Sequence, residues 1–210
     1  MTERNFEFSK NERLQNDSYN QKWIMKNNLI GSEIIELNNL DIPSSKIKDA
    51  GRFQVVWLQN IDRLMKLLPS DIVTKEFSLI DVGCGTGIST LYFASNYNFF
   101  EYCGFDHSQK LISMAHQNFE IFSKNNKENH KISFNICDAN TYSINKKSIL
   151  FLYNPFGSKT LKNMILNNID LLKSTNSVML YANDLFIDDI KDYVKIIGRH
   201  SKHNLSCLRF

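Results

Sequence analysis

The stretch that decides the fold is Leu79-Ile80-Asp81-Val82-Gly83-Cys84-Gly85-Thr86-Gly87, in which an apolar run leads into three alternating glycines. A short apolar run that ends at glycine is typical of a buried strand. Glycines without side chains allow a ligand to lie against backbone N–H groups where a helix begins. The stretch therefore predicts a nucleotide-type site at a strand end, with an ordinary tight turn as the alternative.

The spacing of the glycines separates the possible cofactors. A dinucleotide-binding fold needs Gly-x-Gly-x-x-Gly, and the position of its third glycine is taken here by Ile88. A phosphate-binding P-loop needs Gly-Lys-Ser/Thr after its glycines, and the sequence has none there. A nicotinamide dinucleotide and ATP hydrolysis are therefore both disfavoured.

Strand-like and helical stretches alternate after the glycine loop, which predicts an α/β domain with a mostly parallel sheet. We expect strands at 78–82, 101–105, 132–136, 149–153 and 177–181, followed by a hairpin formed by 195–197 and 205–210. We expect helices at 88–96, 108–122, 161–172 and 184–193, and a surface loop at 123–131.

The chain upstream of the glycine loop divides into two parts. Apolar residues at helical spacing predict an amphipathic helix over 51–68, ended by Pro69. A turn signal at Ile42-Pro43-Ser44-Ser45 separates an N-terminal extension, 1–50, from a main domain, 51–210. Residues 1 to about 20 are polar and lack periodicity, so we expect them to be mobile or folded only against the rest. The apolar groups between Trp23 and Leu40 are too irregularly spaced for an assignment.

Composition limits the class of protein. The 210 residues, 42% of them hydrophobic, suffice for one substantial core. The net charge of +3 comes without a long basic block, so nucleic acid is not supported as a partner. No apolar run approaches the roughly 20 residues that span a membrane, and a cytoplasmic location is expected. The four cysteines form no Cys-x-x-Cys pair, so neither a disulfide framework nor a metal site is expected.

The glycine loop resembles the first motif of the class I S-adenosylmethionine (SAM)-dependent methyltransferases, hydrophobic-hydrophobic-Asp/Glu-x-Gly-x-Gly-x-Gly. The resemblance continues at Asp106, after the second expected strand, and at Asp138-Ala139, after the third, and it covers about residues 51–193. It implies a Rossmann-like methyltransferase fold, with a mostly parallel seven-stranded sheet, helices on both faces and a C-terminal β-hairpin. It also implies SAM as the cofactor and S-adenosylhomocysteine (SAH) as the product.

The resemblance also implies the residues that bind the cofactor. In the family, the acidic residue at the position of Asp106 binds the ribose hydroxyls, and those matching Asp138 and the Ala139 N–H bind adenine. Asp81 is placed to anchor the loop or to bind the methionine amino group, and Arg52 to pair with the methionine carboxylate. The expected set is Arg52, Asp81, Gly83, Cys84, Gly85, Thr86, Gly87, Asp106, His107, Asp138, Ala139 and Asn154.

Each of these assignments has a structural alternative. Asp106 is also suited to cap the following helix, and Asp138 to form a turn. Asp81 is suited to a purely structural turn contact. For Arg52, a solvated position at a helix start is favoured over pairing with the carboxylate.

The segment that bears on the methyl acceptor is Asn154-Pro155-Phe156-Gly157. This segment partly resembles the Asn-Pro-Pro-Tyr/Phe motif of methyltransferases that act on planar amino groups, but its second proline is missing, which weakens that assignment. A strand-ending turn is the alternative. A hydroxyl acceptor would be helped by a base, and His200 and His203, in the expected hairpin turn, are candidate catalytic residues together with Asn154. Histidines in exposed turns are, however, commonly inert.

These observations predict methyl transfer to an O or N atom of a small metabolite or carbohydrate, by a monomer or homodimer. Two alternatives remain open. One is a methyltransferase acting on protein or RNA, with the N-terminal 50 residues as its recognition element. The other is a non-catalytic subunit that keeps the SAM-binding fold.

Overall fold

The structure is a computed structural model that describes residues 8–43, 46–126 and 130–210. Three parts of the expectations above lie outside these residues. They are the first seven residues of the N-terminal extension, the Ser44-Ser45 end of the turn signal and residues 127–129 of the expected surface loop.

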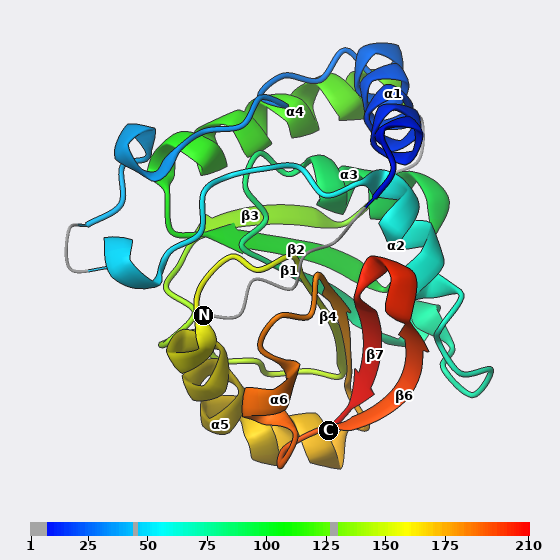
Figure 1. Cartoon of the computed structure of the whole chain (residues 1–210), viewed down its shortest axis with the longest axis vertical. Coiled ribbons are helices and arrows are strands. Elements are labelled where there is room, and N and C mark those ends of the chain that lie inside the picture. Colours follow the sequence, from blue (N-terminus) through cyan, green and yellow to red (C-terminus); the bar gives the residue numbers. More distant parts are fainter. Residues whose placement is uncertain (1–7, 44–45, 127–129) are drawn as a thin grey trace.

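Seven strands of the described chain form one sheet in the order β3-β2-β1-β4-β5-β7-β6 (Figure 1). Strand β7 runs antiparallel to both of its neighbours, and the other pairs are parallel. The expected seven-stranded, mostly parallel sheet with a C-terminal hairpin is therefore confirmed. The strands are β1 (Ser78–Val82), β2 (Glu101–Asp106), β3 (Ile132–Ile136), β4 (Ser148–Leu152), β5 (Val178–Ala182), β6 (Lys195–His200) and β7 (Leu205–Arg209).

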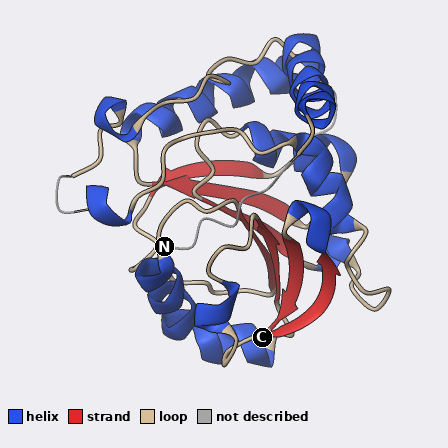
Figure 2. Ribbon diagram, viewed as in Figure 1, coloured by secondary structure: helices blue, strands red, loops and turns tan. Residues whose placement is uncertain are grey.

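Helices cover both faces of the sheet (Figure 2). Leu79 packs into the core on one face and Ile80 into the core on the other, because successive side chains of a strand point to opposite sides. Helices α2 (Leu58–Met65), α3 (Ile88–Asn96) and α4 (Gln109–Asn125) cover the first face, with α1 (Lys10–Lys26) packed on α2. Helices α5 (Ser158–Ser174) and α6 (Ile187–Ile190) cover the second. Among the described residues, no helix combines the length and the apolar character needed to cross a membrane.

The helix expected over 51–68 begins only at Leu58, so that prediction was wrong for its first seven residues. These residues are extended instead, and Phe53 forms an isolated antiparallel bridge with Ile35. The apolar residue Phe53 contributes to the helical spacing in the sequence, but its ring packs on the glycine loop rather than on a helix face. The helical spacing in the sequence therefore combined an apolar residue of an extended segment with apolar residues of α2.

Helix α1 was not expected, because two of the three residues that it buries are asparagines. Asn16 and Asn20 are buried, and the side chain of Asn20 donates to the Val56 carbonyl at 2.8 Å and accepts from the Leu58 N–H at 2.8 Å. A hydrophobic pattern cannot reveal such a face. The signal that was available is the capping box, in which the Ser9 hydroxyl accepts from the Glu12 N–H at 3.2 Å and Glu12 binds back to Ser9.

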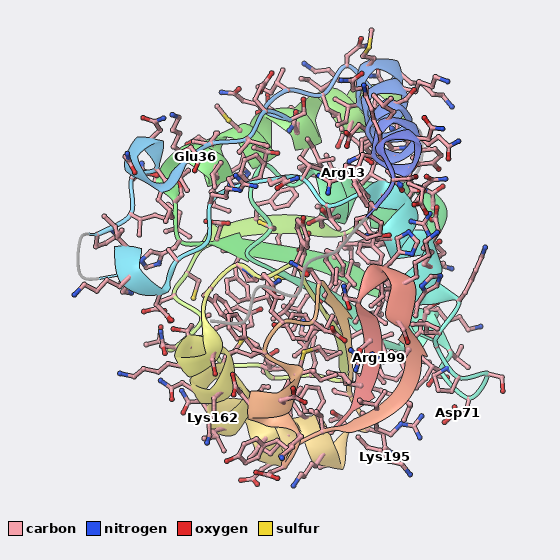
Figure 3. The ribbon with its side chains drawn as sticks, in the orientation of Figure 1. Arg13, Glu36, Asp71, Lys162, Lys195 and Arg199 are labelled. Carbon is pink, nitrogen blue, oxygen red and sulfur yellow. The ribbon has the colours of Figure 1, made fainter. Side chains whose placement is uncertain are left out.

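The outer surface of the molecule is charged. Asp71, Lys162 and Lys195 are exposed and point outward from separate parts of the chain (Figure 3). Single charges that stand apart in this way need no special explanation.

Candidate cofactor site

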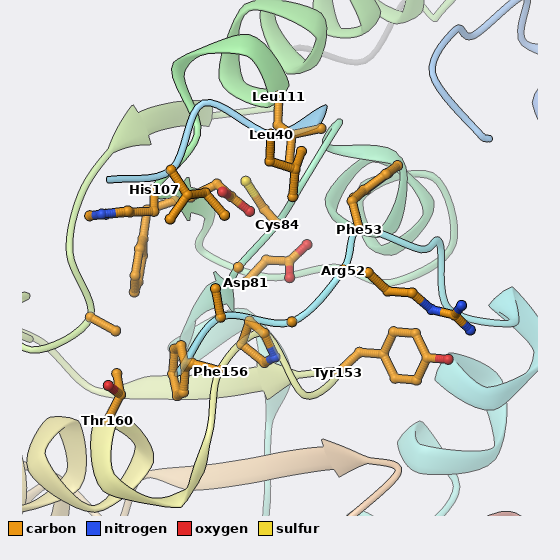
Figure 4. Close-up of a pocket in the computed structure, with 18 of the residues that line it drawn as sticks. Leu40, Arg52, Phe53, Asp81, Cys84, His107, Leu111, Tyr153, Phe156 and Thr160 are labelled. Carbon is orange, nitrogen blue, oxygen red and sulfur yellow. The ribbon is translucent and has the colours of Figure 1, made fainter. Parts of the chain in front are cut away.

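A cavity of about 510 Å³ lies at the carboxyl ends of β1 to β4. The strand order reverses between β1 and β4, and open α/β sheets bind their ligands outside the strand ends at such a point. One wall is made by the residues that follow these strands, and the facing wall by residues from 40 to 56 (Figure 4). The volume lies within the roughly 300–1,000 Å³ that small-ligand sites occupy.

The glycine loop after β1 has a backbone that requires glycine. Gly83, Gly85 and Gly87 have φ angles of 71°, 54° and 77°, in the left-handed region that other residues rarely adopt. A Cβ on Gly83 would lie 2.1 Å from the Cβ of Pro155, and one on Gly85 would lie 2.2 Å from Cε2 of Phe53. Glycine is therefore needed at both positions for the backbone conformation and for the close approach of neighbouring side chains.

Asp106 holds the glycine loop and the start of α4 together. Its Oδ2 accepts from the Gly85 N–H at 3.0 Å, and its Oδ1 accepts from the Ser108 N–H at 2.9 Å. Burial raises the pKa of this carboxyl. The capping residue of α4 is Ser108, whose hydroxyl accepts from the Leu111 N–H at 3.2 Å. Asp106 is thus free of the helix-capping role and lies on the cavity wall.

Asp81 is buried at the end of β1 and lines the cavity. The Thr90 hydroxyl donates to its Oδ2 at 2.6 Å, which ties the strand to α3. Burial raises the pKa of Asp81 to about 7, since a carboxylate is poorly solvated there. The carboxyl therefore serves the structural contact expected of it and also faces the cavity.

Asp138 lies beyond β3 at the same cavity, next to Ala139. The Lys46 ammonium binds its Oδ2, and the Asn140 N–H donates to its Oδ1 at 3.0 Å. Partial burial opposes ionisation, but these donors lower the pKa of Asp138 to about 2. Asp138 therefore makes the turn contact to Asn140 and also lies on the cavity wall.

His107 lies at the Asp106 end of the cavity, where the buried Nε2 of its ring has no hydrogen-bond partner within the described chain. Arg52 and Tyr153 extend together at the opposite end (Figure 4). The guanidinium of Arg52 lies 3.4 Å from the Glu36 carboxylate, and both side chains are more than half exposed. The cavity therefore has a partly buried end with carboxylates and an open end with a cation.

Asn154 follows β4 in the left-handed region, with φ 43°. Its amide N–H donates to the Asn183 carbonyl, and its buried Oδ1 has no partner within the described residues. The Pro155 carbonyl accepts from the Gly51 N–H at 3.1 Å. A planar amino group held by both groups would have to share that carbonyl with the Gly51 N–H, since a carbonyl oxygen can accept two hydrogen bonds. Asn154 itself stands behind the lining residues Tyr153 and Pro155.

The two candidate histidines of the hairpin turn are not at the cavity. His203 is buried, with its Nδ1 3.4 Å from Nδ1 of His200 and its ring 5.2 Å from that of Phe8. Burial lowers the pKa of His203 to about 4. The turn lies at the carboxyl end of β5, where Leu205 pairs with Ala182. It packs near α1, because Lys202 binds Glu12 of that helix. Neither histidine is carried into the proposal below.

The structure brings most of the expected cofactor residues to one cavity. Its lining includes Arg52, Asp81, Gly83, Cys84, Thr86, Asp106, His107, Asp138 and Ala139. Gly85 and Gly87 shape the loop without lining it. Sequence reasoning missed Lys46 and Asp49 in the facing wall and Thr160 in the first turn of α5, which line the cavity and carry no motif. Within the described residues, no cluster of His, Cys, Asp and Glu is arranged to hold a metal ion.

Comparison with known proteins gives the class of protein that this fold resembles. Over 94% of this chain and 97% of the other, the structure resembles magnesium protoporphyrin IX methyltransferase from Synechocystis PCC 6803 with bound SAH, with a TM-score of 0.52 and 14% identity. The fold is that of the Rossmann-like methyltransferases. Residues 79–169 match the family model described as a methyltransferase domain. This part of the chain, less than half of the 210 residues, is therefore similar to methyltransferase domains.

Other solved structures share the fold at lower similarity. The ribosomal protein L11 methylase from Lactobacillus delbrueckii subsp. bulgaricus has a TM-score of 0.47 and 14% identity, over 72% of this chain and 77% of that chain. An rRNA methylase from Streptococcus thermophilus has a TM-score of 0.45 and 12% identity, over 72% and 92%. No match was found among curated proteins.

Proposed function

We propose that this chain transfers the methyl group of SAM to an O or N atom of a small metabolite or carbohydrate and releases SAH. The observation that carries the proposal is the convergence of the glycine loop, Asp106 and Asp138 on one cavity of about 510 Å³. These groups follow three different strands, so only the folded sheet brings them together. A binding site is the physical explanation that accounts for all three.

The polarity of the cavity supports one orientation of the cofactor. We place the adenosine part between His107, Asp106 and Asp138, where carboxylates can accept from ribose hydroxyls and from the adenine amino group. The methionine part then extends past Asp81 toward the open end, where the Arg52 guanidinium can pair with its carboxylate.

The chemistry asks little of the protein beyond alignment. When bound, SAM supplies an activated methyl group on a sulfonium. The chain has to hold the acceptor in line with the sulfur and keep the two at reacting distance. Asn154 follows β4 in a left-handed turn behind Tyr153, which lines the cavity wall, and its buried Oδ1 has no partner within the described residues. We propose that Asn154 is a positioning residue, which holds the turn that carries Tyr153 and Pro155 at the acceptor side of the cavity.

A small acceptor is favoured by the covered cavity. Residues from 40 to 56 form a wall facing the strand ends, which limits the size of the group that can approach. Release of SAH with a panel of small alcohols and amines tests this part. Turnover only with RNA or a protein substrate would instead favour a macromolecular acceptor, and for RNA its binding should fall steeply with salt.

The cofactor part is tested with Asp138→Ala. Loss of a charge-assisted hydrogen bond to the adenine amino group should weaken SAH binding about tenfold or more, measured by calorimetry. The matched control is Asp170→Ala, which removes an exposed carboxylate of α5 outside the cavity and should bind SAH normally. Equal affinity of both variants would remove Asp138 from the cofactor site.

A further inference from the structure

We infer that residues 46–53, here called the gate segment, close the cofactor cavity, and that Lys46 competes with the cofactor's adenine for Asp138. The inference rests on the proposed function, because it takes Asp138 as the adenine-binding carboxylate. It concerns a different property of the site, namely how the cofactor enters.

The gate segment is held firmly at its centre. The Asp49 carbonyl accepts from the Gly157 N–H at 2.8 Å, and its carboxylate accepts from the Thr160 hydroxyl in the first turn of α5. Next along the chain, Ala50 forms an isolated bridge with Phe156, and the Gly51 N–H donates to the Pro155 carbonyl. Two backbone hydrogen bonds, at Asp49 and Gly51, fix this part of the segment on the loop after β4.

The contact at the start of the segment is of a different kind. Lys46 is held to Asp138 by a side-chain ion pair whose partners are 38% and 25% exposed. Partly exposed ion pairs contribute little to stability and are weakened by salt. The gate segment is therefore firmly attached at 49–51 and weakly attached at Lys46. The ion pair between Lys46 and Asp138, here called the latch, can break while residues 49–51 stay in place.

The latch uses a carboxylate oxygen of Asp138 to which the adenine amino group would bind. Oδ1 of Asp138 accepts from the backbone N–H of Asn140 at 3.0 Å and from its side-chain amide at 3.1 Å, and Oδ2 accepts from Lys46. Both carboxylate oxygens thus have donors before any ligand arrives. Oδ2 can accept a second hydrogen bond, but an adenine amino group bound there would share the oxygen with the Lys46 ammonium, so the cofactor competes with the ion pair on entry.

Removal of Lys46 should consequently favour cofactor binding. In Lys46→Met, we expect SAH to associate faster and to bind roughly three- to fivefold more tightly, the worth of a partly exposed ion pair. Lys22→Met is the matched control, since Lys22 is an exposed lysine of α1 that lies outside the cavity and does not bind Asp138. Its SAH affinity and association rate should equal those of the wild type.

Salt provides a second readout, which a merely structural role of Lys46 would not give. Rising salt should speed SAH association in the wild type and in Lys22→Met, because it weakens the ion pair between Lys46 and Asp138, and should leave Lys46→Met unchanged. Calorimetry and stopped-flow association measure the two effects. Lys46→Gln serves as a second variant if Lys46→Met does not fold.

Two outcomes would overturn the inference, and they differ from each other. Normal binding of SAH by the wild type, with equal or weaker binding by Lys46→Met, would overturn the gate alone. Absence of SAH binding by the wild type would overturn the proposed function and the gate with it.

Discussion

Asp81 shows how one residue can serve both the fold and the site. It ends the central strand β1, bonds to Thr90 in α3 and lines the cavity. A carboxylate is a costly group to bury, and the rise of its pKa to about 7 expresses that cost. The acidic position of the motif therefore destabilises the protein near neutral pH, unless a bound cation compensates for it.

The pH dependence of stability should reveal this cost. The pKa of Asp81 is about 7 in the folded chain against an ordinary value of 3.8, so between these pH values the folded state holds a proton that the unfolded state has released. Its contribution to the free energy of unfolding therefore falls as pH rises through this window. Asp81→Asn should gain stability relative to the wild type from about pH 4 to about pH 7, measured by urea unfolding. Parallel profiles would show that Asp81 is ionised throughout.

The residues of the site differ in how far the sequence reveals them. The glycines, Asp106 and Asp138 could be predicted because they stand at or just beyond the ends of β1, β2 and β3 and match the motifs of the family that the sequence resembles. Lys46 and Thr160 could not, because they reach the cavity through contacts 92 and 111 residues away in the chain. Their sequence neighbourhoods contain no pattern that anticipates these pairings.

Among the elements, α1 depends most on polar contacts. The side chain of Asn20 accepts from the N–H of Leu58, the first residue of α2, and donates to the Val56 carbonyl. It thus supplies from another helix the hydrogen bond that a capping residue normally supplies. This contact fixes the start of α2, which the periodicity of the sequence had placed seven residues too early.

Asn20→Ala should lower the free energy of unfolding by about 1–3 kcal/mol, because it leaves a buried N–H and a buried carbonyl unpaired. SAH affinity should not change, since α1 contributes no described residue to the cavity lining. Gln21→Ala, at an exposed position of the same helix, should stay within about 0.5 kcal/mol of the wild type. Chemical denaturation of the three proteins compares them directly. Similar stabilities would mean that water replaces the lost contacts.

The strands show which elements a sequence does reveal. All five residues of β1, β4 and β5 are buried, so these strands appear as continuous apolar runs. Helix α1 shows the opposite case, because two of its three buried residues are asparagines. The order of the strands was not predicted, since periodicity carries no information on which strands are neighbours.

At the scale of the whole molecule, the N-terminal part is integrated with the rest. Ile24 and Leu29 are buried in the core that covers one face of the sheet, and residues 46–53 complete the cavity. We therefore propose that the N-terminal 50 residues act as a cap that shapes the site. In this proposal, the cap covers the cavity that is lined by the glycine loop, Asp106 and Asp138.

We propose above all that this cavity binds the methyl-donor cofactor. A calorimetric titration of the full chain with SAH, with NAD as the comparison ligand, measures this binding. We expect saturable binding of one SAH per chain and no heat with NAD, because Ile88 stands where a dinucleotide loop needs glycine. Absence of SAH binding, or equal binding of NAD, would contradict it.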